Sequence, residues 1–157
     1  MLSIQVAHAP QYIKRLILRA PPEGAALSGK PRQFSVLIVE DDYFVGLGLE
    51  QSFHDAGLNV VGIAVTTEQA IELASRESPD IAIVDVRLAS EKDGIEAAVE
   101  LRLKFGIPSI FATAHGDGAT KARAKAAEPL GWFTKPYAPS DIVDAVKAAI
   151  EEGILGE

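Results

Sequence analysis

Short, uninterrupted runs of apolar residues recur along the chain from residue 34 onward. A strand with one exposed face alternates apolar and polar positions, whereas a continuous apolar run is typical of a strand buried on both faces, as in parallel sheets. Each run is bounded by polar, glycine or proline positions. Strands are predicted at residues 35–39, 59–64, 80–84, 108–112 and 131–134.

The segments between these runs have helical spacing. Val45, Leu49 and Phe53 recur at intervals of four residues, and Thr66 with Gln69 matches a capping box that opens a second helix. Three further helices are predicted at residues 94–105, at residues 119–127 and from residue 139 onward. Five repeats of strand then helix predict an α/β fold, a doubly wound five-stranded parallel sheet with helices on both faces.

The first 33 residues differ in charge from the rest. They hold five basic residues and one acid, a net charge of +4, within a chain whose net charge is −7, so the remainder carries −11. Residues 12–18 can form two amphipathic turns, and Pro21 and Pro22 would end any helix there. We expect residues 1–33 to be a basic, flexible extension, residues 34–152 to form one domain, and residues 153–157 to be a tail. A short docking or membrane-surface helix within residues 1–33 is the alternative.

Composition excludes several classes of site. The chain has no cysteine, which removes disulfides, thiolate zinc sites, iron–sulfur clusters and cysteine nucleophiles. No apolar run approaches the roughly 18–20 residues that span a bilayer, and no secretory signal is visible. The acidic balance argues against direct DNA binding, since phosphate contacts need clustered Lys and Arg. We expect a cytoplasmic protein with no membrane span.

Polar side chains stand where four of the five predicted strands end. Glu40 and Asp41 follow the first strand, Asp85 the third, Thr113 the fourth and Lys135 the fifth. Ligands bind beyond the carboxyl ends of strands in such sheets. Three carboxylates at one edge favour a hard divalent cation such as Mg²⁺, and a lysine and a hydroxyl suit phosphoryl oxygens. An aspartate carboxylate can itself attack phosphorus.

Five motifs occur in the order that one family would have them. They are Val-Leu-Ile-Val-Glu-Asp-Asp at residues 36–42, Ile-Val-Asp-Val-Arg-Leu at 83–88, Asp-Gly at 93–94, Phe-Ala-Thr-Ala at 111–114 and Phe-Thr-Lys-Pro at 133–136. This set resembles the CheY-like receiver domain of two-component response regulators, over about residues 34–152. The resemblance implies a flavodoxin-like (βα)5 fold with strand order 2-1-3-4-5.

The resemblance also implies roles for the acidic residues. Asp85 resembles the phosphoacceptor, and Asp41 resembles the direct Mg²⁺ ligand, with Glu40 contributing through water. The backbone carbonyl of Arg87 would be a further protein ligand, and Asp85 would complete the metal site. The loop from Asp85 to Asp93 looks one residue longer than in the best-known members and lacks their proline, so its path near the metal stays open.

The remaining roles fall on the fourth and fifth strands. Thr113 resembles the switch hydroxyl that turns toward the phosphoryl group, and Lys135 resembles the conserved lysine, followed by a typically cis bond to Pro136. Trp132 stands where many receivers place a Tyr or Phe that swings inward on activation. Asp42 occupies a variable position that is usually not a ligand.

The function implied is that of a phosphoacceptor rather than an enzyme. A histidine kinase or histidine phosphotransfer protein would transfer a phosphoryl group to Asp85 in a Mg²⁺-dependent reaction. The domain would then signal to an unknown downstream protein by a conformational change, or pass the group onward. Because 33 residues precede Phe34 and 22 follow Lys135, we expect a stand-alone receiver. A homodimer through the fourth helix, fifth strand and fifth helix is a further expectation.

Two alternative functions stay open at this point. The first is a phosphorylation-independent interaction module on a receiver fold, which gains if Asp85 never takes up phosphate. The second is a Mg²⁺-dependent aspartyl phosphohydrolase, which multiple turnover on a small phosphate ester would favour. Such enzymes often carry two aspartates separated by one residue after the first strand, a spacing that Glu40-Asp41-Asp42 does not match.

Overall fold

The computed structural model describes residues 32–155, which contain one five-stranded parallel sheet. Its order is β2-β1-β3-β4-β5, so the expected fold class and strand order are confirmed. Three strands have the predicted bounds, β3 begins one residue later, and β4 is shifted by one residue. The strands are β1 (Ser35–Val39), β2 (Asn59–Ala64), β3 (Ile81–Val84), β4 (Ser109–Thr113) and β5 (Gly131–Thr134).

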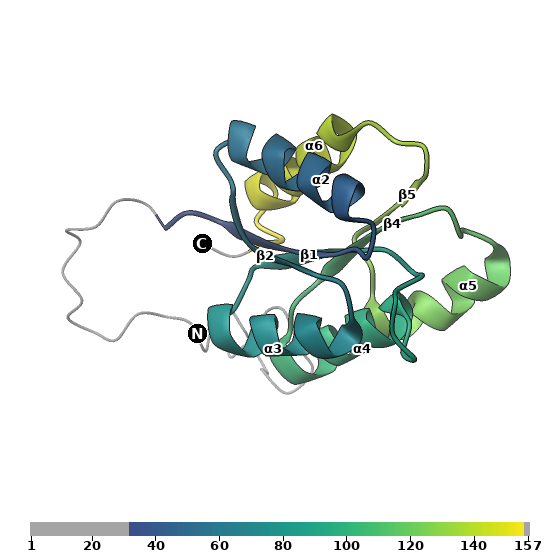
Figure 1. The fold of residues 1–157 in the computed structure, drawn as a ribbon. Helices are drawn as coiled ribbons and strands as arrows, with labels where there is room; N and C mark the ends of the chain where they lie inside the picture. Colours follow the sequence, from purple (N-terminus) through teal and green to yellow (C-terminus); the bar gives the residue numbers. More distant parts are fainter. Residues whose placement is uncertain (1–31, 156–157) are drawn as a thin grey trace, which may run out of the picture.

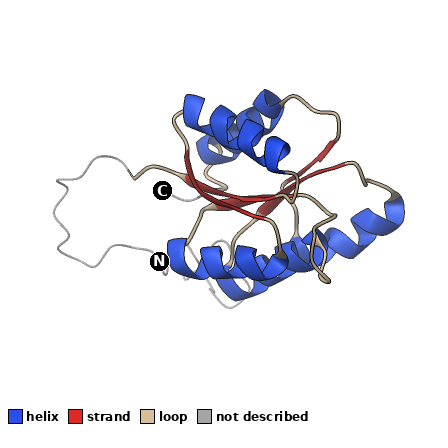
Figure 2. Cartoon of the chain, viewed as in Figure 1, coloured by secondary structure: helices blue, strands red, loops and turns tan. Residues whose placement is uncertain are grey.

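Helices cover both faces of the sheet (Figures 1 and 2). On one face lie α2 (Tyr43–Asp55) and α6 (Pro139–Glu151). On the other lie α3 (Thr67–Glu77), α4 (Gly94–Phe105) and α5 (Gly118–Arg123), which continues as the 3₁₀ helix η2 (Ala124–Ala127). Within residues 32–155, no helix combines the length and apolar character needed to cross a membrane.

The strand side chains divide between two apolar clusters, one on each face. Leu37 and Val39 pack with the α3 and α4 side, whereas Val36 and Ile38 pack with the α2 and α6 side. All four are fully buried, because successive side chains of a strand point to opposite faces and both faces are covered. Burial of both faces of the sheet therefore explains the continuous apolar runs in the sequence, as predicted.

The predicted helix over residues 119–127 is wrong in its second half. The α-helix ends at Arg123, and the chain continues as the tighter 3₁₀ helix η2. Ala124 and Ala127 of η2 are fully buried in the apolar cluster on the α4 side of the sheet. Glu128 then adopts a left-handed conformation, with φ of 46°, and accepts a 2.6 Å hydrogen bond from Arg102 of α4. The alanine-rich sequence has no broad apolar stripe, so two small buried side chains and this ion pair set its path.

The capping box predicted at Thr66 is present only in part. The Thr66 hydroxyl accepts a hydrogen bond from the Gln69 backbone N–H at 3.2 Å. The Gln69 side-chain oxygen, however, accepts from the N–H of Val65 and not from that of Thr66. A complete reciprocal box occurs instead at the start of α4, between Asp93 and Glu96.

The chain enters the domain at the edge where the strands begin. Arg32 forms an ion pair with the buried carboxylate of Asp80, which also accepts from the Ser35 backbone N–H at 2.9 Å. The Gln33 side chain donates to the Gly57 carbonyl at 2.7 Å. Residues 1–31 of the predicted extension lie outside the described residues, but its last two residues are bonded to the domain.

Candidate functional site

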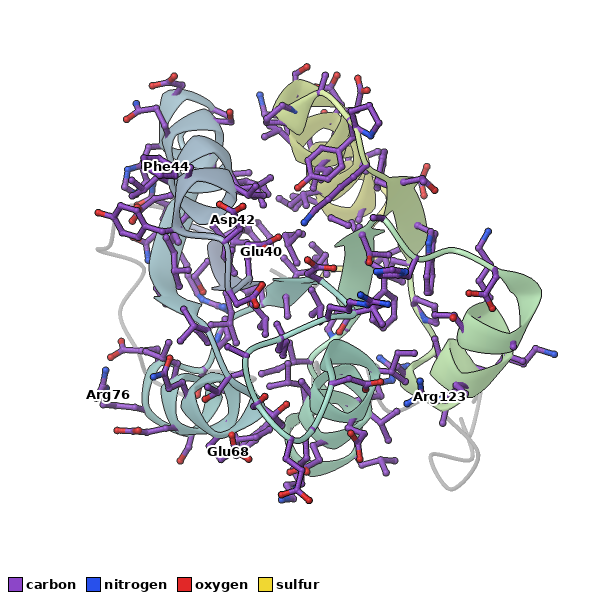
Figure 3. All side chains as sticks on the ribbon, turned by 45° about the vertical axis from the view of Figure 1, so that its right-hand side comes forward. Glu40, Asp42, Phe44, Glu68, Arg76 and Arg123 are labelled. Atoms are coloured by element: carbon purple, nitrogen blue, oxygen red, sulfur yellow. The ribbon has the colours of Figure 1, made fainter. Side chains whose placement is uncertain are left out.

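The predicted acidic residues meet at the edge where the parallel strands end. One carboxylate oxygen from each of Glu40, Asp41 and Asp85 lies within 4.8 Å of the others. The backbone joins the two strand ends, because the Asp85 N–H donates to the Val39 carbonyl at 2.9 Å. Figure 3 shows Glu40 and Asp42 leading from the sheet edge into the first turn of α2. The sheet order therefore brings together three carboxylates that are up to 45 residues apart in the chain.

Lys135 bridges two of these carboxylates. Its ammonium group donates to Asp85 Oδ2 at 2.8 Å and to Glu40 Oε2 at 2.9 Å. Partial burial by itself would lower the pKa of Lys135, but the hydrogen bonds to Asp85 and Glu40 outweigh it and raise the pKa above its usual value. Lys135 is therefore a permanent cation in the site, poised beside the carboxylate of Asp85. Its peptide bond to Pro136 is cis, as expected.

Glu40 is the most buried of the three acids, with 2% of its surface exposed. Burial raises its pKa above the usual range, although hydrogen bonds from the Asp42 backbone and from Lys135 act in the opposite direction. The Asp42 N–H donates to Oε1 at 3.0 Å and Lys135 donates to Oε2, so both carboxylate oxygens already accept a hydrogen bond. This arrangement suits a residue that acts on an ion through an intervening water.

Asp41 and Asp42 have different roles despite their adjacent positions. Asp42 is the N-cap of α2, and its Oδ1 accepts from the backbone N–H groups of Phe44 and Val45 at 3.0 and 3.2 Å. Asp41 is exposed and belongs to the carboxylate cluster, whereas Asp42 does not. Capping therefore accounts for Asp42, and Asp41 is the accessible acid at the end of β1.

Thr113 is fully buried at the end of β4. Its hydroxyl oxygen accepts from the His115 backbone N–H at 3.2 Å, and its carbonyl accepts from the Lys135 N–H at 2.9 Å. The first bond ties the hydroxyl to the loop that leads into α5. The second joins the backbone of β4 to that of the lysine-bearing strand end.

Trp132 packs against the sheet under the loop that precedes α5. Its ring lies 4.6 Å from that of Phe111, and the Lys121 ammonium lies 5.6 Å from its centre. The indole N–H is buried and has no hydrogen-bond partner among residues 32–155. A Cβ on Gly116 would come within 3.0 Å of that nitrogen, so the loop closes directly over the ring. The switch role of Trp132 stays a prediction.

The loop between β3 and α4, whose path the sequence left open, is clamped to the start of α3. The Thr67 hydroxyl donates to the carbonyls of Lys92 and Asp93, each at 3.3 Å, and the Ser90 hydroxyl donates to the Lys92 carbonyl at 2.7 Å. Arg87, in the loop that follows β3, has an exposed side chain. The metal-ligand role of its backbone carbonyl stays a prediction.

Gly94 lies where no side chain fits. A Cβ there would lie 1.7 Å from the Asp85 carbonyl oxygen, and the Gly94 N–H donates to the Val86 carbonyl at 2.7 Å. Gly94→Ala is therefore expected to lower the free energy of unfolding by about 2–3 kcal/mol, since the backbone beside Asp85 must shift. The measurement is urea denaturation followed by circular dichroism.

Gly48→Ala is the matched control for this substitution. Gly48 lies inside α2, and a Cβ there meets nothing within 4 Å. Alanine should stabilise the helix by about 0.5–1 kcal/mol, because glycine loses more backbone entropy on folding. Equal stability changes for the two variants would contradict the close approach at Gly94.

Two residues at the site edge were missed by the sequence reasoning. Phe44, in the first turn of α2, is 82% exposed, and the Tyr137 hydroxyl is buried without a partner in the described part of the chain. Burial raises the pKa of Tyr137. Both line a groove of about 390 Å³ between α2 and the chain that follows β5. The departure of Phe44 from the 45, 49, 53 spacing was the available signal.

Comparison with known proteins gives a consistent result. Residues 36–147 match the family described as the response regulator receiver domain. The transcriptional regulatory protein PdtaR of Mycobacterium tuberculosis is 33% identical over 129 residues, which are 82% of this chain and 62% of that protein. Chemotaxis protein CheY of Thermotoga maritima is 31% identical over 71% of this chain and 92% of its own length.

Solved structures agree with these relatives. The receiver domain of a modulated diguanylate cyclase from Desulfovibrio desulfuricans has a TM-score of 0.72 and 34% identity, over 80% of this chain and all of that one. Matches to the first four curated relatives span 43% to 62% of their lengths, so each extends beyond the shared region. The fold, the order of the motifs and these matches agree, and the chain belongs to the response regulator receiver family.

Proposed function

We propose that this receiver accepts a phosphoryl group on Asp85 in a Mg²⁺-dependent reaction, with a phosphohistidine of a histidine kinase or phosphotransfer protein as donor. The observation that carries the proposal is the bridge from Lys135 to Asp85 and Glu40 beside the exposed Asp41. This arrangement has a carboxylate nucleophile, a fixed cation and an acidic cluster within one small site. Phosphoryl transfer depends mainly on such positioning and charge stabilisation.

The donor set fits a hard divalent cation. Carboxylate oxygens are ligands that Mg²⁺ accepts, and it commonly binds through one or two carboxylates together with waters and phosphate oxygens. In the proposal Asp41 and Asp85 hold the ion directly, with the Arg87 carbonyl, and Glu40 acts through water. Bound there, Mg²⁺ would offset the charge of the acids and of the incoming phosphoryl oxygens.

The chemical step balances without any further reactant. An oxygen of the Asp85 carboxylate forms a bond to phosphorus while the phosphorus–nitrogen bond of the donor histidine breaks. The imidazole leaves with the bonding electron pair and takes a proton. Lys135 interacts with the negative charge on the phosphoryl group, and Thr113 supplies a hydroxyl that turns toward it. Water later hydrolyses the acyl phosphate, which makes the domain a phosphoacceptor and not a catalyst of turnover.

In this proposal, phosphorylation of Asp85 signals by changing the surface that the domain presents to other proteins. A phosphoryl group on Asp85 draws the Thr113 hydroxyl away from the His115 N–H, which loosens the loop over Trp132 and shifts α5. A downstream protein reads the altered face, or the group is passed onward. The face formed by α5, β5 and α6 is the proposed homodimer surface.

The test is incubation of the full chain with acetyl phosphate, with Mg²⁺ or with excess EDTA, followed by intact-mass measurement. The expected result is one added phosphoryl group with Mg²⁺ and none with EDTA, lost again on treatment with hydroxylamine, which cleaves acyl phosphates. No uptake from acetyl phosphate or from any phosphohistidine donor would support a phosphorylation-independent module instead. Multiple turnover on a small phosphate ester, in place of acetyl phosphate, would support a phosphohydrolase.

A further inference from the structure

The groove at the edge of the site leaves large apolar side chains in solvent. We define the α2–α6 groove by Phe44, Val45, Gly48, Lys135, Tyr137 and Pro139. Phe44 is 82% exposed, and beside it Tyr43 is 65% and Leu47 36% exposed. The first turns of α2 therefore present a nearly continuous apolar ridge, next to the lysine that contacts Asp85. Figure 3 shows Phe44 on the outer side of α2.

Both helices that flank this groove have an excess of acids, as α3 on the opposite face also does. α2 contains Glu50 and Asp55 and no lysine or arginine, and it is preceded by two exposed aspartates. α6 contains three acids and Lys147. On the opposite face, α5 and η2 carry three basic residues and no acid. An occupant of the α2–α6 groove should therefore be apolar on one side and basic on the other.

Residues 12–18 of this chain have that composition. In a helix, the apolar residues at 12, 13, 16 and 17 would fall on one side, while Lys14 and Arg15 would fall on the other, with Leu18 between them. We propose that this segment docks in the α2–α6 groove of the same molecule, with its apolar side on Phe44 and its basic side toward the flanking acids. The structure does not describe these residues, so the proposal rests on the groove, the charges and the sequence.

The connecting chain is long enough for this contact. Arg32 is held on Asp80, at the edge where the strands begin. The groove lies at the other edge, about 16 Å away along the five residues of β1. The 14 residue steps from Leu18 to Arg32 span at most about 45 Å, with a root-mean-square length near 20 Å for a flexible chain. The segment reaches the groove without strain.

Docking there would make the segment a competitor of protein phosphodonors. A docked helix would cover the apolar surface beside Lys135, which a large donor must approach, but leave a small phosphodonor free to enter. This consequence rests on the proposed function, whereas the docking itself does not. The decisive experiment therefore measures how close the segment lies to the groove, by disulfide formation, and does not depend on phosphorylation.

Since the chain has no cysteine, an introduced pair supplies its only thiols. The test pair is Leu16→Cys with Gly48→Cys, where a Cβ at Gly48 meets nothing within 4 Å. The control pair is Leu16→Cys with Leu103→Cys. Leu103 is 70% exposed in the last turns of α4, on the opposite face of the sheet. α4 ends at the edge where Arg32 enters, so an undocked segment reaches Leu103 at least as easily.

Under mild oxidation of the full chain, the test pair should form an intramolecular disulfide at least about tenfold faster than the control pair, because docking raises the local thiol concentration. Adding Ile13→Asp and Ile17→Asp should reduce that rate to the control level, whereas Leu27→Asp, outside the docking segment, should not change it. Equal rates for the two pairs, a disulfide between two chains, or a rate insensitive to the aspartates at 13 and 17 would each overturn the proposal.

Discussion

Asp85→Asn is expected to abolish phosphoryl uptake from acetyl phosphate and from phosphohistidine donors. The amide keeps the shape of the side chain and an oxygen that can accept the Lys135 hydrogen bond, which is 2.8 Å long in the parent chain. It lacks the anionic oxygen that attacks phosphorus. The measurement is radiolabelled phosphate transfer with intact-mass confirmation, and the expected residual uptake is at background.

Asp144→Asn is the control for this variant. Asp144 lies exposed on α6, and its substitution removes the same charge from the chain without touching the carboxylate cluster. It should be phosphorylated at the parent rate. If Asp85→Asn still takes up one phosphoryl group, the acceptor is another residue, and peptide mapping after borohydride reduction would locate it. Both variants should unfold in one cooperative transition, since neither leaves a buried charge without a partner.

Lys135→Met is expected to give the largest change in stability at this site. The substitution keeps the aliphatic stem but removes the ammonium that bridges Glu40 and Asp85, whose side chains are only 3% and 9% exposed. Two nearly buried carboxylates then face each other without a cation, which should lower the free energy of unfolding by about 3 kcal/mol at neutral pH. Phosphoryl transfer should slow by at least about a hundredfold. Lys147→Met, exposed on α6, should change neither quantity appreciably.

The stability loss in Lys135→Met should depend on pH with a definite sign. Burial already raises the pKa of Glu40 in the parent chain, and the variant removes the hydrogen bond and charge of Lys135 that lower it. A carboxyl whose pKa is higher in the folded than in the unfolded state stabilises the fold as it takes up a proton. The deficit should therefore be full above this raised pKa and shrink as the pH falls through it. A deficit that grows on acidification would contradict the bridging role.

Much of the fold was predictable because burial on both faces is visible in the sequence. Leu37 and Ile38 point to opposite faces and are both fully buried, which accounts for the unbroken apolar run over residues 36–39. The strand ends then placed Glu40 and Asp85 at one edge by topology alone. The sequence could not reveal how Lys135 divides its hydrogen bonds between them, because that depends on side-chain packing across segments 95 and 50 residues apart.

The errors occur where local pattern and tertiary contact compete. Residues 124–127 have high helix propensity, yet the burial of Ala127 and the bond from Arg102 to Glu128 end the α-helix early. The exposure of Phe44 was also missed, because an aromatic residue next to an apolar stripe is ordinarily buried, and only its departure from the 45, 49, 53 spacing indicated otherwise. Helix spacing alone does not show that the groove between α2 and the Lys135–Pro139 segment is open.

The position of Trp132 gives the protein a built-in optical probe. It is the only tryptophan in the 157-residue chain. Fluorescence excited at the red edge of indole absorption therefore comes from this one side chain, with no contribution from residues 1–31. Its N–H is buried without a partner within residues 32–155, which predicts a short-wavelength emission maximum. Because Gly116 of the overlying loop closes on the same nitrogen, any rearrangement of that loop should change the emission colour. Ligand titrations and stopped-flow kinetics can thus be followed on the unlabelled chain.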